Sequence, residues 1–332
     1  MAYPIEKKLV IAVASSALFD LGESDRVFRE QGLEPYRQYQ RSREDTPLIP
    51  GVAFPLIRRL LSLNGTAEDN QPIEVVLLSR NDPDTGLRVF KSIQHYGLGI
   101  TRAAFTNGRP PFRYLDAFNA ALFLSANPED VRSAAMRGAP AGQVFPTDFV
   151  DDLSDPELRC AFDFDGIVAD DSAEAVFKSD GLQAFLDSEA KAATVPMPAG
   201  PLSKLFRELA ALQGRERQRR EADPLYQPRI RVAIMTARNA PAHERVVTTL
   251  RAWGIEVDEV FFLGGIDKAR ILEVFRPHIF FDDQLGHVEG ARRLVPCAHV
   301  PFGVANKPSI EAAVEEADRE HAQRQARSRS GQ

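Results

Sequence analysis

Short apolar runs alternate with longer amphipathic stretches along the 332 residues of the chain. Several runs are rich in β-branched and aromatic residues and are apolar throughout, which is typical of strands covered on both faces. The strand candidates are residues 9–14, 73–79, 120–126, 160–165, 230–236, 259–264 and 278–283. Between them, segments such as 55–63 and 243–254 have a helical spacing of apolar positions. This alternation predicts an α/β protein built on mainly parallel sheets.

The pattern also repeats within the chain. Residues 73–127 align without a gap with residues 230–284, at a shift of 157 positions (230 − 73). Identical pairs along this alignment include Val75/Val232, Arg88/Arg245, Gly97/Gly254, Gly108/Gly265 and Phe123/Phe280. Two α/β units can resemble one another by pattern alone, but the absence of a gap favours an internal duplication. Upstream, the strand at 9–14 corresponds to the strand at 160–165.

We therefore expect two related α/β lobes and a tail. The first lobe covers residues 1–150 and the second covers residues 151–314. Residues 170–228, within the second lobe, are too long for a simple crossover and include a helical stretch, so they predict a small helical insertion. The basic run at 214–223 has no apolar face and is interpreted as an exposed helix end or loop, with phosphate binding as the alternative. Residues 315–332 are polar and charged, and we expect them to be frayed.

Composition narrows the function classes. The chain has 41 basic and 47 acidic residues, a balance that argues against a nucleic acid polymer as the partner. No apolar stretch reaches the roughly 18 residues that a membrane-spanning helix needs. Cys160 and Cys297 are the only cysteines, so a disulfide framework is not expected and a reducing, cytoplasmic location fits.

Two carboxylates end the strand candidate at 160–165. The run Asp163-Phe164-Asp165-Gly166 places them at the carboxyl edge of the strand, where open α/β sheets bind ligands, and Gly166 permits the chain to turn away. Two carboxylates this close repel each other, so a cation or a shared proton is expected. Mg²⁺ prefers such oxygen ligands. The alternative is a polar strand end followed by a turn.

Polar residues follow three later strand candidates. Thr236 ends the strand at 230–236, and its hydroxyl, with the backbone N–H groups after it, suits a phosphate oxygen. Lys268 could neutralise both a phosphate and Asp163. Asp282 and Asp283 follow an apolar run, which is unusual for a plain surface. Taken singly, each has a structural alternative: a helix N-cap for Thr236, a solvated surface lysine for Lys268, and an acidic helix start for the last pair.

Taken together, the order D-x-D, Thr, Lys, D-D resembles the haloacid dehalogenase superfamily of phosphatases. The resemblance implies that Asp163 is the nucleophile and Asp165 the general acid and base. It implies that the phosphoryl oxygens are bound by Thr236, Ala237, Arg238 and Lys268. Mg²⁺ would be bound by the Asp163 carboxylate, the Asp165 backbone carbonyl and an acid of the last pair. Asp283 is the first choice there, with Asp282 as a further ligand or a supporting residue.

Longer strings give a closer match. Residues 17–40, 50–64, 77–108, 236–265 and 278–284 resemble the cytosolic 5′-nucleotidase I family. This resemblance implies a HAD-like Rossmann-type fold in which the insertion at 170–228 forms a cap. It implies Mg²⁺-dependent hydrolysis of nucleoside 5′-monophosphates, with AMP prominent, through an aspartyl-phosphate. It also implies a homo-oligomer and, in some members, activation by a nucleoside diphosphate.

The first half lacks the chemistry of the second. The repeat places Ser79, Pro111, Ser125 and Ala126 where the second half has Thr236, Lys268, Asp282 and Asp283. We predict a degenerate lobe that shapes the nucleoside pocket or an effector site. The candidate loop consists of Ser79, Arg80, Asn81 and Asp82, and the alternative for it is a capped turn between a strand and a helix.

Two other functions remain as alternatives for the whole chain. One is a phosphatase of the same superfamily that acts on another small phosphomonoester. The other is a non-catalytic nucleotide sensor, because half of the chain already lacks the acids. The intact pair Asp163 and Asp165, together with Asp283, favours an enzyme over a sensor.

Overall fold

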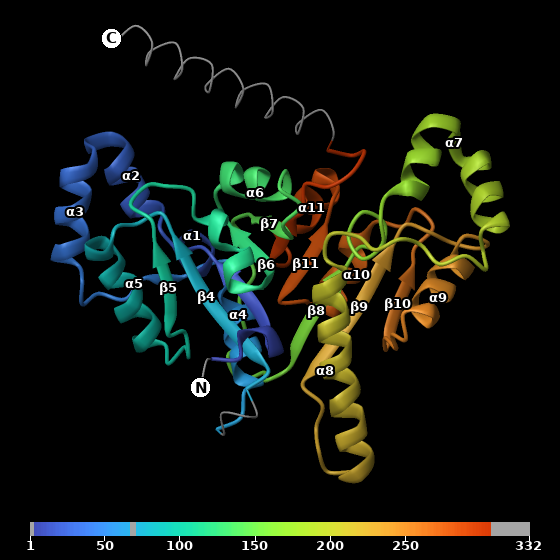
Figure 1. Ribbon diagram of the computed structural model, residues 1–332, viewed down its shortest axis with the longest axis horizontal. Helices are drawn as coiled ribbons and strands as arrows, with labels where there is room; N and C mark the ends of the chain where they lie inside the picture. Colours follow the sequence, from blue (N-terminus) through green and yellow to red (C-terminus); the bar gives the residue numbers. More distant parts are fainter. Residues whose placement is uncertain (1–2, 67–70, 307–332) are drawn as a thin grey trace, which may run out of the picture.

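A single ten-stranded sheet runs through the centre of the molecule in a computed structural model that describes residues 3–66 and 71–306 (Figure 1). Its strand order is β10-β9-β8-β11-β12-β7-β6-β1-β4-β5, and neighbouring strands are parallel except β7 and β12. The strands are β1 (Leu9–Val13), β4 (Ile73–Ser79), β5 (Arg102–Phe105), β6 (Ala120–Ser125), β7 (Ala141–Val144), β8 (Leu158–Phe162), β9 (Ile230–Thr236), β10 (Glu259–Phe262), β11 (Ile279–Asp282) and β12 (Cys297–His299). A separate two-residue pair joins β2 (Phe19–Asp20) to β3 (Ile49–Pro50). The α/β class with a mainly parallel sheet is confirmed, but the sheet is one continuous layer.

Helices surround this sheet. They are α1 (Ser15–Leu18), α2 (Gly22–Gln31), α3 (Leu33–Ser42), α4 (Phe54–Ser62), α5 (Pro83–His95), α6 (Pro128–Ala135), α7 (Ser172–Lys191), α8 (Ser203–Ala222), α9 (His243–Ala252), α10 (Lys268–Phe275) and α11 (Leu285–Ala291). Short 3-10 turns cover Ile5–Lys7, Pro111–Tyr114 and Asp116–Phe118. Among the described helices, none is long and apolar enough to cross a membrane.

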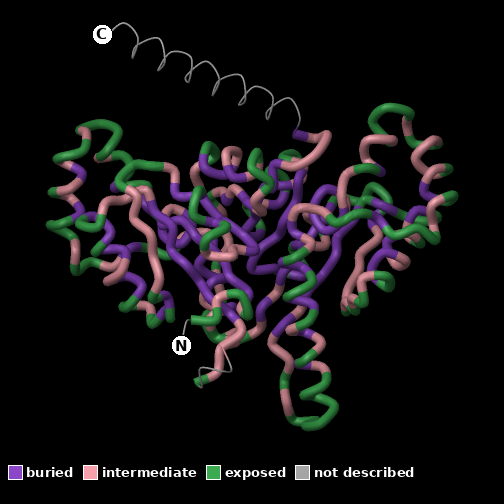
Figure 2. The backbone as a smooth tube through the Cα atoms, viewed as in Figure 1, coloured by how far each residue is buried: buried purple, intermediate pink, exposed green. Residues whose placement is uncertain are grey.

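The core lies on the strands, which are buried along most of their length (Figure 2). Every residue of β1 and β4 is buried, as the apolar runs predicted. Phe162 of β8 stacks on Phe281 of β11 and meets Phe206 of α8 edge to face, with ring centroids 5.0 and 5.3 Å apart. Burying each such ring stabilises the fold by about 1.5–3 kcal/mol, so this cluster fixes the strand that carries Asp163.

Each predicted strand is present: those at 73–79 and 230–236 have the predicted bounds, and the others differ at one or both ends. The expected strand at 160–165 begins earlier and ends at Phe162, because the chain leaves the sheet at Asp163. The short strands β5, β7 and β12 were not predicted. Each is only three or four residues long, and their sequences RAAF, AGQV and CAH show neither alternation nor a long apolar run.

The backbone on one side of the β7–β12 pair repeats on the other. The order β7-β6-β1-β4-β5 matches β12-β11-β8-β9-β10, and β4 and β9, like β5 and β10, begin 157 residues apart (230 − 73 and 259 − 102). Residues with positive φ also recur at this spacing: Gly97/Gly254, Asn107/Gly264, Gly108/Gly265 and Asn119/Arg276. These backbone features add to the sequence repeat. The boundaries at 1–150 and 151–314 remain a prediction, and the expected tail at 315–332 lies outside the described residues.

The insertion at 170–228 contains two different helices. Helix α7 stands outside the sheet, opposite the α2–α3 pair at the other end of the molecule (Figure 1). Helix α8 instead packs on the sheet through Leu205, Phe206 and Leu209. Its exposed end contains most of the run at 214–223, so that run is a helix end. Only α7 is therefore placed as a cap would be.

Candidate active site

The D-x-D run forms a tight turn at the end of β8. The Asp163 N–H still donates to the Phe281 carbonyl of β11, at 2.8 Å, and the Phe164 N–H donates to the Asp163 carboxylate, at 2.7 Å. Gly166 then reverses the chain with φ 74°. A Cβ at Gly166 would lie 2.6 Å from the carboxyl carbon of Asp283, so only glycine lets the two segments approach this closely.

Lys268 joins two of the acids. It is the first residue of α10, and Asp267 caps that helix by accepting from the Ala269 N–H. The buried Lys268 ammonium lies 2.9 Å from Asp163 Oδ2 and 2.7 Å from Asp282 Oδ2. Burial alone would lower the pKa of Lys268, but the attraction of the two carboxylates raises it above its ordinary value. Lys268 is thus a fixed positive charge beside Asp163 and Asp282.

Asp282 has a full set of partners. Its carboxylate accepts from Lys268 and from the Gln284 N–H, and the His287 ring nitrogen Nδ1 lies 3.1 Å away. Burial raises the pKa of Asp282, but Lys268 and His287 outweigh burial and lower the pKa overall. His287 was not predicted from the sequence. Its place on α11, about one turn beyond the strand end, is the signal that could have found it.

Asp283 has the opposite surroundings. It is fully buried, and neither carboxylate oxygen has a hydrogen-bond partner. Its backbone carbonyl accepts from His299 and from the Asn306 side chain, each at 2.9 Å, which fixes the residue in place. Burial, with the charges of Asp163 and Asp282, raises the pKa of Asp283 to about 9. Burial likewise raises the pKa of Asp163, with Lys268 opposing it.

These acids fit a divalent cation. A buried carboxylate with no donor normally neutralises or binds a cation, and Asp283 lies against the turn that carries Asp163 and Asp165. A second arrangement places ligand atoms of Asp163, Asp282 and His287 within 4.8 Å of one another. We favour Asp283 over Asp282 as the direct ligand, because the Asp282 oxygens are already occupied by Lys268, Gln284 and His287.

Thr236 ends β9, which lies beside β8 in the sheet, and Ala237 and Arg238 follow it. The Thr236 hydroxyl is buried and accepts from the Arg238 N–H, at 3.2 Å, while Ala237 is exposed. The Arg238 guanidinium does not point into open space. Its Nε and Nη2 donate to the two oxygens of Asp165, each at 2.7 Å, and its Nη1 donates to the buried Glu189 of α7. Phosphate binding by Thr236, Ala237 and Arg238 stays a prediction, with this guanidinium committed to carboxylates.

The candidate loop of the first half lies elsewhere. Ser79 ends β4. In the sheet, β4 is separated from β9 by six strands: β8, β11, β12, β7, β6 and β1. Arg80 binds the buried Asp130 through both oxygens, Asn81 accepts from Tyr36, and Asp82 caps α5 by accepting from the Thr85 N–H. The structural alternative therefore holds for Asp82, and the loop is not part of the cluster around Asp163 and Lys268.

Comparison with known proteins points to one family. The 5′-nucleotidase family model matches residues 1–307. Human cytosolic 5′-nucleotidase 1B is 37% identical over 302 residues, which cover 89% of this chain and 49% of that protein. The chain thus spans about half the length of this curated relative. No solved structure matches the chain at a comparable level.

The matched region contains the whole acid–lysine cluster, from Asp163 and Asp165 through Lys268 to Asp282 and Asp283. The resemblance drawn from the motifs and the comparison with whole sequences therefore agree. The chain belongs to the 5′-nucleotidase family.

Proposed function

We propose that this protein is a phosphoric monoester hydrolase that cleaves nucleoside 5′-monophosphates, AMP prominent among them, to a nucleoside and phosphate. The observation that carries the proposal is the buried contact between Asp163 and Lys268 beside the unpartnered Asp283 carboxylate. Asp163, Asp282 and Asp283 are buried together with Lys268, and charged side chains are rarely buried in this number without a function. Membership of the 5′-nucleotidase family supports the nucleotide as substrate.

Asp163 acts as the nucleophile in this proposal. One of its carboxylate oxygens attacks phosphorus in line with the ester oxygen, so a P–O bond forms to Asp163 while the bond to the nucleoside breaks. Lys268 offsets the repulsion between the phosphate and Asp163, because its ammonium already lies against that carboxylate. Thr236 and the backbone N–H groups after it orient the phosphoryl oxygens.

Asp165 transfers the protons. It gives a proton to the departing nucleoside oxygen, then takes one from the water that hydrolyses the aspartyl-phosphate and releases phosphate. Asp163, the Asp165 carbonyl and Asp283 would hold Mg²⁺, with Asp282 in support, and the ion would supply positive charge that offsets the phosphate. All of these donors are oxygens, which favours Mg²⁺ over softer metals.

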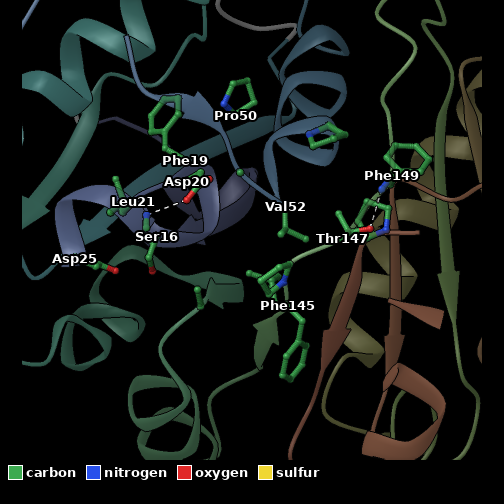
Figure 3. Close-up of a pocket in the computed structure, with 17 residues that line it drawn as sticks. Ser16, Phe19, Asp20, Leu21, Asp25, Pro50, Val52, Phe145, Thr147 and Phe149 are labelled. Atoms are coloured by element: carbon green, nitrogen blue, oxygen red, sulfur yellow. Dashed lines mark hydrogen bonds between the residues drawn. The ribbon is translucent and has the colours of Figure 1, made fainter. Parts of the chain in front are cut away.

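The first half is proposed to bind a ligand of its own or to shape the substrate pocket. Two cavities of about 410 and 420 Å³ lie at the carboxyl edge of its strands and share Ser16, Leu21, Asp25 and Ala126. One is walled by phenylalanines, with Phe145 and Phe149 entering from the segment after β7 (Figure 3). The other contains the candidate loop, including Ser79, Arg80 and Asn81. A polar and an aromatic compartment side by side suit a nucleotide, and a nucleoside diphosphate is the proposed effector.

Two further features belong to the proposal. The relative is named cytosolic, and two buried free cysteines suit a reducing compartment, so we place the protein in the cytoplasm. A homo-oligomer is proposed from the family resemblance alone.

A substrate panel tests the function. Phosphate release is measured for nucleoside monophosphates and for sugar phosphates, with Mg²⁺ or with EDTA. We expect AMP hydrolysis in Mg²⁺, little in EDTA, and a loss of at least about 10⁴-fold in Asp163→Asn, because the nucleophile is gone. Preference for sugar phosphates would identify another phosphatase of the superfamily. Nucleotide binding without any turnover would identify a sensor, and full activity in Asp163→Asn would overturn the mechanism.

A further inference from the structure

A buried chain of charges connects the cap helix α7 to the acid Asp165. Arg238 binds both oxygens of Asp165, and its third nitrogen donates to Glu189 of α7. The other oxygen of Glu189 accepts from Arg245 of α9, at 2.7 Å. Arg238 and Glu189 are both buried, whereas Asp165 and Arg245, at the two ends of the chain of charges, are partly exposed. The chain thus ends at the group that transfers the proton.

Aromatic rings confine the guanidinium of Arg238. It lies 5.6 Å from the ring of Phe164, which sits between the two catalytic acids, and 5.5 Å from the ring of Phe185 on α7. One side of Arg238 is therefore the catalytic turn and the other side is the cap helix. A displacement of α7 would remove one wall and the Glu189 partner together.

The other half of the chain contains the same framework without an acid. Helices α2 and α3 correspond to α7 at a shift of 149 (181 − 32), since both bend at a glycine with φ 87° or 83°. An edge-to-face ring pair also recurs, Phe28 with Tyr36 and Phe177 with Phe185.

The hydrogen bonds of this framework recur as well. Arg88 donates to the Thr46 carbonyl as Arg245 donates to the Val195 carbonyl, each at 3.0 Å. The Leu48 N–H donates to Ser92 as the Met197 N–H donates to Thr249. These contacts support the helices in both halves.

The residues that lead to Asp165 are the ones that differ. At the position of Glu189 the first half has Gln40, which accepts from Arg88 at 3.2 Å. At the position of Arg238 it has Asn81, which accepts from Tyr36. The framework therefore holds with neutral residues at both positions. The charges of Arg238 and Glu189 are present only in the half that has an acid to position.

We propose that Arg238 and Glu189 are positioning residues that hold Asp165 in its proton-transferring orientation while α7 lies over the catalytic strands. The inference rests on the proposed function and adds to it a physical link between the cap and the general acid. Two hydrogen bonds to one carboxylate fix its plane as well as its place, which a single bond would not. Glu189 does the same for the guanidinium.

The test compares two leaving groups. AMP releases an alcohol, which needs a proton as it leaves. Its 5′-S-phosphorothiolate analogue releases a thiol, which can leave as the thiolate because thiols such as that of cysteine have a pKa of about 8.5. The ratio of kcat/KM for the two esters therefore reports on Asp165, and Asp165→Asn supplies the reference. We expect kcat/KM for AMP to fall by about 100-fold in Arg238→Asn and by about 10-fold in Glu189→Gln. The loss for the phosphorothiolate should be much smaller.

Controls separate positioning from stability. Gln40→Glu exchanges the matched residue of the other half, and it should leave the ratio unchanged. Arg238→Lys, which keeps the charge but offers no fork, should recover only part of the AMP activity. In an Asp165→Asn background, Glu189→Gln should cause no further loss of AMP hydrolysis, because the group it positions is gone.

Equal losses on both esters, or a further loss in the Asp165→Asn background, would overturn the inference in favour of a structural role. No loss in Glu189→Gln would overturn it too, and that variant decides the matter if Arg238→Asn does not fold. A wild-type protein that hydrolyses neither ester would instead refute the proposed function. If the wild-type protein hydrolyses AMP normally and Asp165→Asn is the only variant that lowers the activity, the link between α7 and Asp165 is refuted and the proposed function stands.

Discussion

At the scale of single residues, the contrast between Asp282 and Asp283 defines the site. They are neighbours in the sequence and both are buried, yet the Asp282 carboxylate has three hydrogen-bond partners and the Asp283 carboxylate has none. An ionised, unpaired carboxylate in the interior is costly, so the protein without metal keeps Asp283 protonated up to a pKa of about 9. Asp283 therefore links stability to both pH and metal.

Metal removal should make stability fall as pH rises. In the unfolded chain the Asp283 carboxyl should ionise with the pKa of a free aspartate, about 3.9. The folded protein holds that proton up to about pH 9, so the stabilisation is complete below pH 4 and is lost as pH rises through 9. Calorimetry in EDTA should show Tm falling between pH 6 and pH 9. Added Mg²⁺ should raise Tm at each pH, with the largest increase at pH 9.

The variant Asp283→Asn gives the matched comparison. It should flatten the dependence of Tm on pH in EDTA and remove most of the stabilisation by Mg²⁺, whereas the exposed Asp116→Asn should change neither. A Mg²⁺ effect that survives intact in Asp283→Asn would show that Asp282 and His287 form the metal site instead.

The clustering of Asp163, Lys268 and Asp282 could be predicted from the sequence because parallel strands bring their carboxyl ends to one edge. Asp163 follows β8, Lys268 comes after β10 and Asp282 ends β11, and the structure places the three in contact. Glu189 could not be predicted in this way. It lies in the last turn of α7, where a glutamate gives no signal of a site, and only the packing of α7 near the end of β9 gives it Arg238 as a partner.

At the scale of elements, the bend of α7 sets where Glu189 lies. Gly181 has φ 83° and ψ −176°, a conformation that costs other residues of order 1–3 kcal/mol. A Cβ there would meet nothing within 4 Å, so the cost of a substitution is backbone strain and not a clash. The chain offers a matched position in Gly32, which has nearly the same angles and the same open space between α2 and α3.

Gly181→Ala and Gly32→Ala should therefore lower Tm by similar amounts but differ in catalysis. Relief of strain in α7 would shift Glu189 and Arg238, so Gly181→Ala should lower kcat for AMP by about 10-fold, within the range that small misplacements cause. Gly32→Ala should keep full kcat. Steady-state kinetics and thermal unfolding of the two proteins measure this, and equal kcat values would argue against a catalytic role of the bend.

Some elements could not be predicted because packing against neighbours, and not their own sequence, determines them. Strands β5, β7 and β12 are short, and their place in the sheet comes from pairing with longer neighbours and not from their own sequence. The insertion at 170–228 read as one cap because both helices are long and mixed in polarity. The buried apolar residues of α8, among them Leu205, Phe206 and Leu209, pack it on the sheet.

At the scale of the whole molecule, β7 and β12 join two copies of one fold into one sheet. A single hydrophobic core contains residues from β1, β4, β8 and β9 alike. Because the halves share this core, the first half cannot be lost without exposing the second. Structural need alone would therefore preserve the first half, and its cavities need a test of their own.

The loop of that first half, Ser79 to Asp82, can be tested by substitution. Arg80 and Asn81 line the polar cavity, and the double variant Arg80→Ala, Asn81→Ala removes one of its two guanidinium groups and an amide nitrogen that has no partner. If the loop shapes the substrate pocket, KM for AMP should rise. If it binds an effector, the response to a nucleoside diphosphate should disappear while KM without effector stays the same. Kinetics with and without the diphosphate distinguish these outcomes, with Arg220→Ala on the exposed end of α8 as the control. Because Arg80 also pairs with the buried Asp130, unfolding is measured alongside, and a fully folded variant with unchanged KM and response would refute a ligand-binding role.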